Sequence, residues 1–136
     1  MRMLARVAIT ASSLALAAFA AAPANAAGNA KYVAHSRHEL GSSCSYGGKT
    51  GFESYGEWLT VTDTCADGHS AVGVINIANS TYYYWNSKGA DTTRRVNMEF
   101  AENAQVGIKS CLGDWSGTAT DGILWETCGE ITFGSA

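Results

Sequence analysis

The stretch EWLTVTDTCADGHSAVGVINIA, residues 57–78, decides the fold of this chain. Its first part, residues 57–63, alternates apolar side chains with threonine, and its last part, residues 71–78, is rich in Val and Ile. Both patterns are typical of β-strands. The Asp67-Gly68 pair between them favours a tight primed turn, because both residues tolerate left-handed dihedrals. We therefore predict that the two runs form a β-hairpin.

Strand patterns continue toward the C-terminus. The clearest lies at residues 95–100, where Val96, Met98 and Phe100 face one side and polar residues face the other. No stretch after residue 27 combines a helical period with helix formers and caps. Short strands separated by turns predict an all-β, two-sheet antiparallel β-sandwich, immunoglobulin-like or jelly-roll-like, with a small barrel as the alternative. Further strands are expected at residues 81–85, 105–111, 123–128 and 130–133.

The N-terminal residues have the pattern of a signal peptide. Arg2 and Arg6 precede an apolar run over residues 7–22, and Ala24–Ala26 offers the small-x-small pattern that a signal peptidase cleaves. We expect cleavage after Ala26, so that residues 1–26 are removed and the protein is secreted. No later apolar run reaches the length of about 20 residues that a membrane helix needs, so we expect no membrane partner after cleavage.

The mature chain has the size of one domain. Removing 26 of 136 residues leaves 110 and lowers the basic residues from nine to seven against 12 acidic ones, a net charge of −5. Without a basic run, we expect no nucleic-acid partner. Residues 27–43 are polar and weakly periodic, and they predict an N-terminal arm whose pairing with the sheet is left open. Residues 44–136 then form the sandwich domain.

Four cysteines, Cys44, Cys65, Cys111 and Cys128, all lie in the exported part. In a small secreted domain they predict two disulfides, for which three pairings are possible. We favour Cys44–Cys65 and Cys111–Cys128, since each pair brackets a short strand-turn-strand segment. In the chain-entropy picture, each disulfide that closes a loop of this size stabilises a domain by roughly 3 kcal/mol. No C-x-x-C or paired Cys/His spacing indicates zinc.

Residues that could carry chemistry lack the context that chemistry needs. His35 and His38 lie three apart, but their segment has no helical pattern, and His69 follows a turn as a solvated residue. Asp63 and Asp67 could offer oxygen to calcium, yet the spaced series of a calcium loop is absent. No nucleophile elbow, phosphate loop or dinucleotide motif occurs. We expect no catalytic residue, metal or cofactor, and no enzyme.

An aromatic run supplies the candidate binding residues. On a strand, Tyr82 and Tyr84 share one face, and Tyr83 and Trp85 share the other. One pair should enter the core, while the other either forms an exposed patch for a partner or fills cross-strand sites. Trp115, in a loop of Gly, Asp and Ser, is either a plug over the sandwich end or a contact residue. These five residues are the predicted partner-binding set.

Two segments resemble a group of small actinobacterial exported, disulfide-bonded β-sandwich proteins. Residues 59–71 match the signature V-x-D-x-x-A-D-G-x-x-A, and residues 106–114, followed by Cys128, are similar to the second half of the group. The resemblance implies export and a β-sandwich, without a settled activity. Some members look like adaptor subunits of secreted umbrella toxin particles, in which a short N-terminal arm docks a partner.

A fainter similarity is to the tendamistat-type α-amylase inhibitors, which are exported β-sandwiches with sequential disulfides. Residues 63–66, Asp-Thr-Cys-Ala, resemble a stretch near their second cysteine. The Trp-Arg-Tyr triplet that these inhibitors insert into the enzyme is absent, since Trp58 is followed by Leu59 and Thr60.

Three functions are therefore open. The first is a non-enzymatic protein-binding module, such as an adaptor of a secreted complex, that uses the aromatic run, the loop 86–91 and the arm 31–40. The second is a proteinaceous inhibitor of a secreted hydrolase, with one loop entering an active site. The third is a carbohydrate or cell-wall binding domain, which needs coplanar exposed rings. The stoichiometry is left open.

Overall fold

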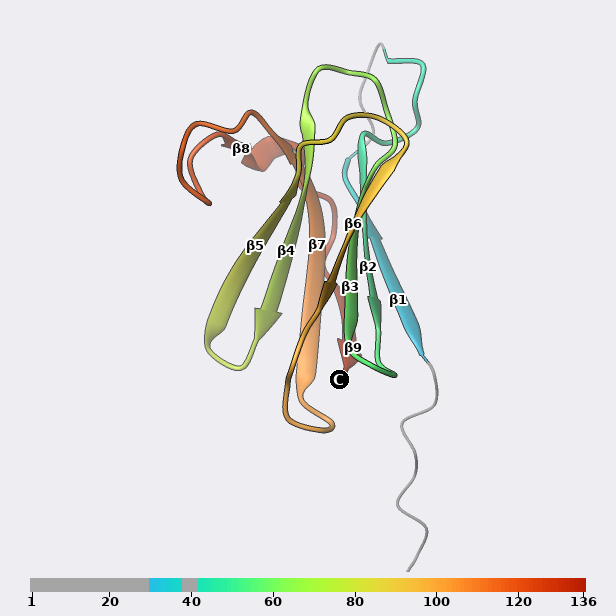
Figure 1. The fold of residues 1–136 in the computed structure, drawn as a ribbon, viewed down its shortest axis with the longest axis vertical. Coiled ribbons are helices and arrows are strands. Elements are labelled where there is room, and N and C mark those ends of the chain that lie inside the picture. Colours follow the sequence, from blue (N-terminus) through green and yellow to red (C-terminus); the bar gives the residue numbers. More distant parts are fainter. Residues whose placement is uncertain (1–29, 38–41) are drawn as a thin grey trace, which may run out of the picture.

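Nine strands form two antiparallel sheets packed face to face in a computed structural model of the chain, which describes residues 30–37 and 42–136 (Figure 1). Sheet A has the strand order β1 (Lys31–His35), β2 (Gly48–Glu53), β3 (Trp58–Asp63) and β6 (Thr92–Asn97). Sheet B has the order β5 (Ser80–Asn86), β4 (Ser70–Ile77), β7 (Gln105–Gly113) and β8 (Ile123–Leu124), with β9 (Thr132–Ser135) also paired to β7. The predicted all-β, two-sheet sandwich is confirmed.

Among the described residues, the one helical element is a 3₁₀ turn, η1 (Trp125–Thr127). That part of the chain holds no helix long and apolar enough to cross a membrane. The signal peptide, its cleavage site and His38 lie outside the described residues.

The main core lies between the two sheets. Alternate residues of each strand point inward, so the apolar positions of the period-two pattern meet across the interface. At residues 95–100, Val96 and Phe100 pack against this core and Met98 is buried in it, as the alternation predicts. The largest fully buried apolar side chains here are Phe52, Leu59, Val61, Ile75, Val106 and Ile108.

Sheet B is buried on its outer face as well. Ala71 and Ile75 of β4 belong to the main core, whereas Val72 and Val74 belong to a second cluster with Ile123. The chain after β7 folds back over this outer face and supplies the cover (Figure 1). Burial on both faces explains why β4 is a continuous apolar run instead of an alternating one.

The predicted hairpin of residues 57–63 and 71–78 is wrong. β3 lies in sheet A and β4 in sheet B, and residues 64–69 cross between the sheets. Gly68 does adopt the left-handed conformation, with φ of 84°, but its turn changes sheets. β4 instead forms its hairpin with β5. A strand that is apolar on both faces is buried best at the centre of a covered sheet, between β5 and β7.

Other elements differ locally from the prediction. β2 was not expected, although its residues alternate between buried and half-buried, because its glycines weaken the strand signal. Residues 123–128 form the short β8 followed by η1 instead of one strand, and the last strand lies at Thr132–Ser135. The segment 27–43, for which pairing was left open, contributes β1, which pairs with β2 along its length.

Both preferred disulfides are confirmed. Cys44–Cys65 joins the loop before β2 to the crossover after β3, and Cys111–Cys128 joins β7 to the chain that follows η1. The second bridge lies in the outer cluster of sheet B and fixes the cover to the sheet. Two such bonds are consistent with folding in an oxidising environment.

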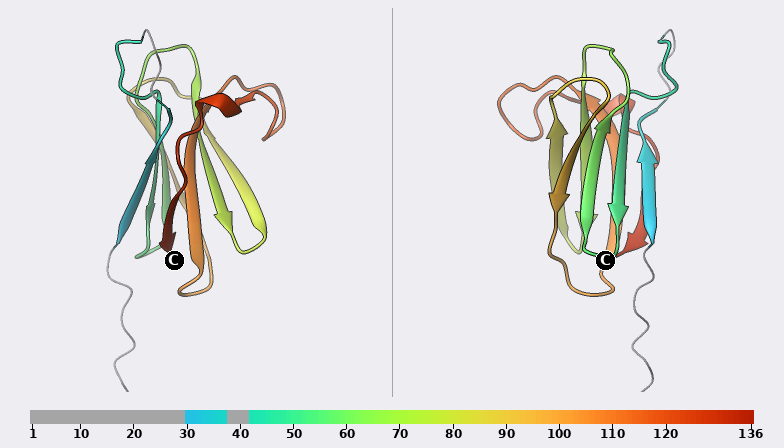
Figure 2. Two further views of the ribbon diagram at one scale, coloured as in Figure 1. Left: turned by 180° about the vertical axis from the view of Figure 1, so that it is seen from behind. Right: turned by 45° about the vertical axis from the view of Figure 1, so that its right-hand side comes forward.

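The two sheets meet along one side of the sandwich, at β1 and β9, and on the other side they meet near the end where β5 passes into β6 (Figure 2). On one side β1 lies beside β9, and Thr132 Oγ1 donates a hydrogen bond to Val33 O at 3.2 Å. On the other side, the chain passes from β5 into β6. There the buried Asn86 amide donates to Val61 O at 3.2 Å and to Thr92 O at 2.8 Å.

Candidate functional site

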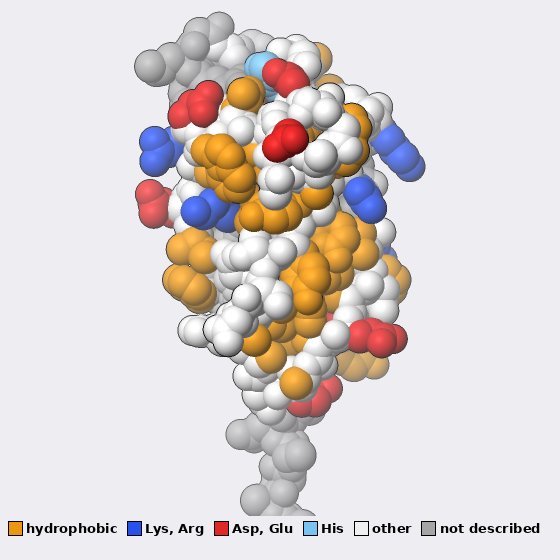
Figure 3. Space-filling view, turned by 90° about the vertical axis from the view of Figure 1, so that its left-hand side faces the viewer, with side chains coloured by type: hydrophobic (Ala, Val, Ile, Leu, Met, Phe, Trp, Pro, Cys, Tyr) orange, Lys and Arg blue, Asp and Glu red, His pale blue; other side chains and the backbone are white. Residues whose placement is uncertain are grey.

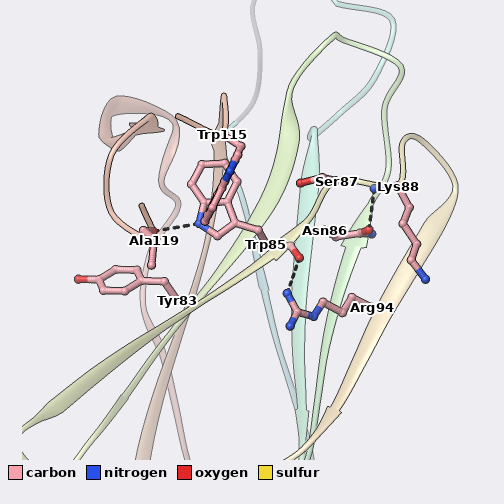
Figure 4. A pocket seen from close by; sticks show the side chains of 8 residues that line it. All are labelled: Tyr83, Trp85, Asn86, Ser87, Lys88, Arg94, Trp115 and Ala119. Atoms are coloured by element: carbon pink, nitrogen blue, oxygen red, sulfur yellow. Dashed lines mark hydrogen bonds between the residues drawn. The ribbon is translucent and has the colours of Figure 1, made fainter. Parts of the chain in front are cut away.

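A cleft of about 540 Å³ opens where β5 meets the loop after β7 (Figure 4). It combines aromatic rings with a polar and cationic rim, and β5, the β5–β6 connection, β6 and the loop after β7 all contribute to it. Its lining residues are Tyr83, Trp85, Asn86, Ser87, Lys88, Arg94, Trp115 and Ala119. The cleft therefore brings together three of the five predicted binding residues.

Trp85 forms the floor of this aromatic cleft. Its side chain is 7% exposed and packs in the outer cluster of sheet B. The indole Nε1 donates a hydrogen bond to Ala119 O at 2.9 Å, so this buried N–H group has a hydrogen-bond partner. The ring of Trp115 meets it edge-on, with centroids 5.2 Å apart and an interplanar angle of 83°. Trp85 is thereby fixed in position.

The loop that carries Trp115 is held at its base. Asp114 N donates to Gly122 O at 2.8 Å, and the Asp114 carboxylate lies 2.8 Å from His69 Nδ1. Gly122 has a φ of 82°, and a side chain there would collide with Asp114 O, so only glycine closes the loop this tightly. Trp115 itself is 54% exposed. It acts neither as a full plug nor as a free side chain, because one edge is packed and the rest is open.

Trp125, which the sequence did not single out, extends the aromatic surface. It lies on η1, is 52% exposed, and meets Tyr83 edge-on at a centroid distance of 6.2 Å. Figure 3 shows hydrophobic side chains in a diagonal band on the side of the molecule where β5 lies. Its segment, residues 123–128, was predicted as a strand, and because aromatic residues are common in strands, the sequence pattern does not distinguish this Trp from a packing residue.

The four aromatic residues of β5 divide differently from the prediction. Tyr84 packs against the main core while Tyr82, on the same face, is 43% exposed. On the other face Trp85 is buried and Tyr83 is half-buried. Neither pair is wholly inside or wholly outside, because both faces of sheet B are covered near the Trp85 end and open near the hairpin with β4.

The rim of the cleft is cationic. Arg94 Nη1 donates to Trp85 O at 2.8 Å, and its guanidinium lies 5.6 Å from the centroid of the Tyr84 ring. Lys88 stands on the exposed β5–β6 connection. Asn86 is buried below them, and its Oδ1 accepts a hydrogen bond from Lys88 N at 3.2 Å. The cleft thus offers apolar walls with positive charge on one side only.

The remaining titratable candidates are placed in structural roles. The ring of His35 stacks on Tyr46 with centroids 4.2 Å apart. Burial, opposed by a hydrogen bond from Cys65 N and aided by the charges of Asp67 and Asp91, raises the pKa of Asp63 above its ordinary value.

Across residues 30–37 and 42–136, no three His, Cys, Asp or Glu side chains are grouped so that they could hold a metal ion. Asp63 and Asp67, weighed above as calcium ligands, do not belong to such a group. Of the five predicted partner-binding residues, Tyr83, Trp85 and Trp115 line one cleft. Comparisons of this chain with protein-family models, with curated proteins and with solved structures found no match.

Proposed function

We propose that this chain is an exported, non-enzymatic module that binds another protein at the aromatic cleft. The observation that carries the proposal is the state of Trp115, which is 54% exposed although the base of its loop is fixed. Trp and Tyr dominate the binding energy of protein interfaces, usually at their centre. A ring that is already fixed loses little conformational entropy on docking.

The composition of the cleft favours a particular kind of contact. Trp85, Trp115 and Tyr83 form apolar walls, and Lys88 and Arg94 lie on one rim. A partner residue with an apolar or aromatic side chain would fill the cleft, and an acidic neighbour would meet the two cations. Charge pairs at a rim steer encounter and register more than they add affinity.

The angle between the rings favours a protein over a polysaccharide. Sugars stack on flat, coplanar ring surfaces, whereas Trp85 and Trp115 stand at 83° to each other. Perpendicular rings make a corner that receives one side chain better than an extended sugar face. The two disulfides and the leader pattern of residues 1–26 support action outside the cytoplasm.

The test is recovery of a partner from culture supernatant by the immobilised mature protein. Three forms are compared: the unchanged protein, Trp115→Ala, and Tyr55→Ala as the matched control. Tyr55 is 76% exposed and lies in the β2–β3 turn, at the opposite end of the sandwich from the cleft (Figure 1). Both changes remove a large exposed ring, so a difference between them reports position.

We expect one protein to be recovered by the unchanged form and by Tyr55→Ala, and about 30-fold weaker binding by Trp115→Ala, as for an interface residue worth about 2 kcal/mol. Equal binding by all three forms would refute the cleft as the contact surface. Loss of a recovered hydrolase's activity on mixing would replace the module with an inhibitor. Adsorption to insoluble polysaccharide without a recovered protein would replace it with a carbohydrate-binding domain.

A further inference from the structure

The outer edge of β5 presents backbone groups that no neighbouring strand uses. Within the described part of the chain, β5 pairs with β4 alone. The hydrogen bond from Arg94 reaches Trp85 O from the side of β6, so this carbonyl points away from β4. Strand residues direct their N–H and C=O groups to alternate sides. Tyr83 and Thr81 therefore direct theirs to the same outer edge.

This edge lacks the features that usually prevent strand pairing. Natural proteins protect an edge with charged residues, proline, a short strand or a covering segment. The β5 sequence STYYYWN contains neither charge nor proline over seven residues. In contrast, β6 carries Arg94 and Arg95, β1 begins with Lys31, and β8 has only two residues. β9 is covered, because Gly134 lies against the ring of Tyr32.

The unprotected part of the edge is accessible. Figures 1 and 2 show the turn end of the β4–β5 hairpin standing away from sheet A. Ser80 and Thr81 are exposed, and Tyr82 is 43% exposed. Toward the other end of β5, Arg94 occupies the Trp85 carbonyl and restricts approach. The segment open to a new strand is therefore the half of β5 around Tyr82.

We propose that a second copy of this chain pairs with that segment, so that two β5 strands join antiparallel across a two-fold axis. The outward-facing residues, Thr81 and Tyr83, are spaced symmetrically around Tyr82. With the axis at Tyr82, each Thr81 faces Tyr83 of the second copy and each such pair exchanges both N–H···O bonds. The same surface serves on both copies, as a two-fold interface requires.

The alternative axis at Tyr83 would place Thr81 opposite Trp85, whose carbonyl is already bonded to Arg94. The axis at Tyr82 avoids that competition. It also sets the two Tyr82 side chains against each other in the closely spaced kind of pair, where aromatic residues stabilise a sheet.

Pairing of this kind joins the two copies of sheet B into one continuous sheet. A two-fold axis perpendicular to the sheet keeps both outer faces on the same side, so the two aromatic clefts face the same way. The dimer would engage a repetitive or two-fold partner with both clefts at once, which strengthens binding through effective concentration. Dimerisation needs only β5, so it stands or falls separately from the protein-binding proposal.

The test measures the mass of the mature protein by sedimentation equilibrium from about 1 µM to about 1 mM, a range that covers weak and moderate dimers. Four variants are compared in two matched pairs. Thr81→Pro removes the outward N–H, whereas Thr81→Ala keeps it, and both lose the same hydrogen bond to Asn76 Oδ1. Proline is tolerated on an edge strand where the N–H points outward. Tyr82→Lys sets like charges against each other on the axis, whereas Tyr82→Phe keeps the ring.

We expect the unchanged protein, Thr81→Ala and Tyr82→Phe to double in mass as concentration rises, and Thr81→Pro and Tyr82→Lys to remain at the mass of one chain. If Thr81→Pro fails to fold, as judged by circular dichroism, the Tyr82 pair decides. A single-chain mass for the unchanged protein over the whole range would overturn the proposal. So would a dimer that survives in Tyr82→Lys, since a different surface would then be responsible.

Discussion

Removing the Cys111–Cys128 bridge by a double change to alanine should destabilise the protein more than removing Cys44–Cys65. The bridges close segments of 17 and 21 residues, so the chain-entropy relation gives about 3 kcal/mol for each. The difference must come from packing. Cys111 is fully buried and Cys128 is 7% exposed, and both pack in the outer cluster of sheet B; Cys44 is half-buried, and Cys65, although 5% exposed, belongs to neither hydrophobic cluster.

Loss of those packed sulfurs adds about 1 kcal/mol, the usual cost of a small buried void. We expect a total loss of about 4 kcal/mol for Cys111→Ala/Cys128→Ala and about 3 kcal/mol for Cys44→Ala/Cys65→Ala. In a domain of this size, each corresponds to a fall in Tm of more than about 10 °C.

The assay is urea unfolding followed by far-ultraviolet circular dichroism and by tryptophan fluorescence. Without the Cys111–Cys128 bridge, the cover of sheet B should loosen first, so the fluorescence transition should precede the loss of β-structure. Trp85, Trp115 and Trp125 all lie at or beneath that cover. The control variant should give coincident transitions. If Cys111→Ala/Cys128→Ala lost less free energy of unfolding than the control variant, and both variants gave coincident transitions, the view that this bridge fixes the cover would be refuted.

Three further changes test other parts of the structure. Gly73→Ala would bring a methyl group to 2.6 Å from Val61 Cγ2 across the sheet interface. We expect the free energy of unfolding, measured by thermal unfolding, to fall by about 1–3 kcal/mol. An unchanged Tm would contradict the tight packing of the sheets. Arg95→Ala removes a guanidinium 4.1 Å from the Trp58 ring centroid and should cost about 0.5–1 kcal/mol, with Arg95→Lys retaining part of it. Burial raises the pKa of Asp63, so ionisation of this carboxyl destabilises the fold as pH rises through the folded-state pKa. Asp63→Asn should therefore have a larger free energy of unfolding than the unchanged protein at pH 7. If this difference in free energy did not become smaller as pH falls toward the ordinary carboxyl pKa, the assignment would be contradicted.

The sequence was sufficient where a local pattern sets the structure. Period-two alternation predicted most of the strands, because in a sheet that is covered on one face the side chains of a strand point alternately to the core and to solvent. The disulfide pairing followed from bracketing, since Cys111 and Cys128 enclose a short segment that returns to its own starting strand. The aromatic run on β5 was found because tyrosine and tryptophan at successive positions are conspicuous by composition alone.

The sequence was insufficient where position depends on distant segments. The Asp67-Gly68 turn has the residues of a hairpin, but the choice between a hairpin and a crossover depends on what covers β4. A run that is apolar on both faces indicates double coverage, so the pattern of β4 contained the better signal. The contact of Trp125 with Tyr83 joins residues 42 positions apart, and no local pattern indicates it.

The loop between β7 and β8 is closed at its base and exposed along its length. Asp114 N donates a hydrogen bond to Gly122 O at the two ends of the loop, and residues 114–121 are all exposed, although one edge of the Trp115 ring packs on Trp85. Because none of these side chains is buried, substitutions at residue 116 and at residues 118–121 would leave the β-sandwich intact and change only the surface beside the cleft, whereas Gly117, with a φ of 106°, favours glycine. On the proposed function, changes at these few exposed positions would alter the partner that is bound and leave the packed core, on which folding depends, unchanged.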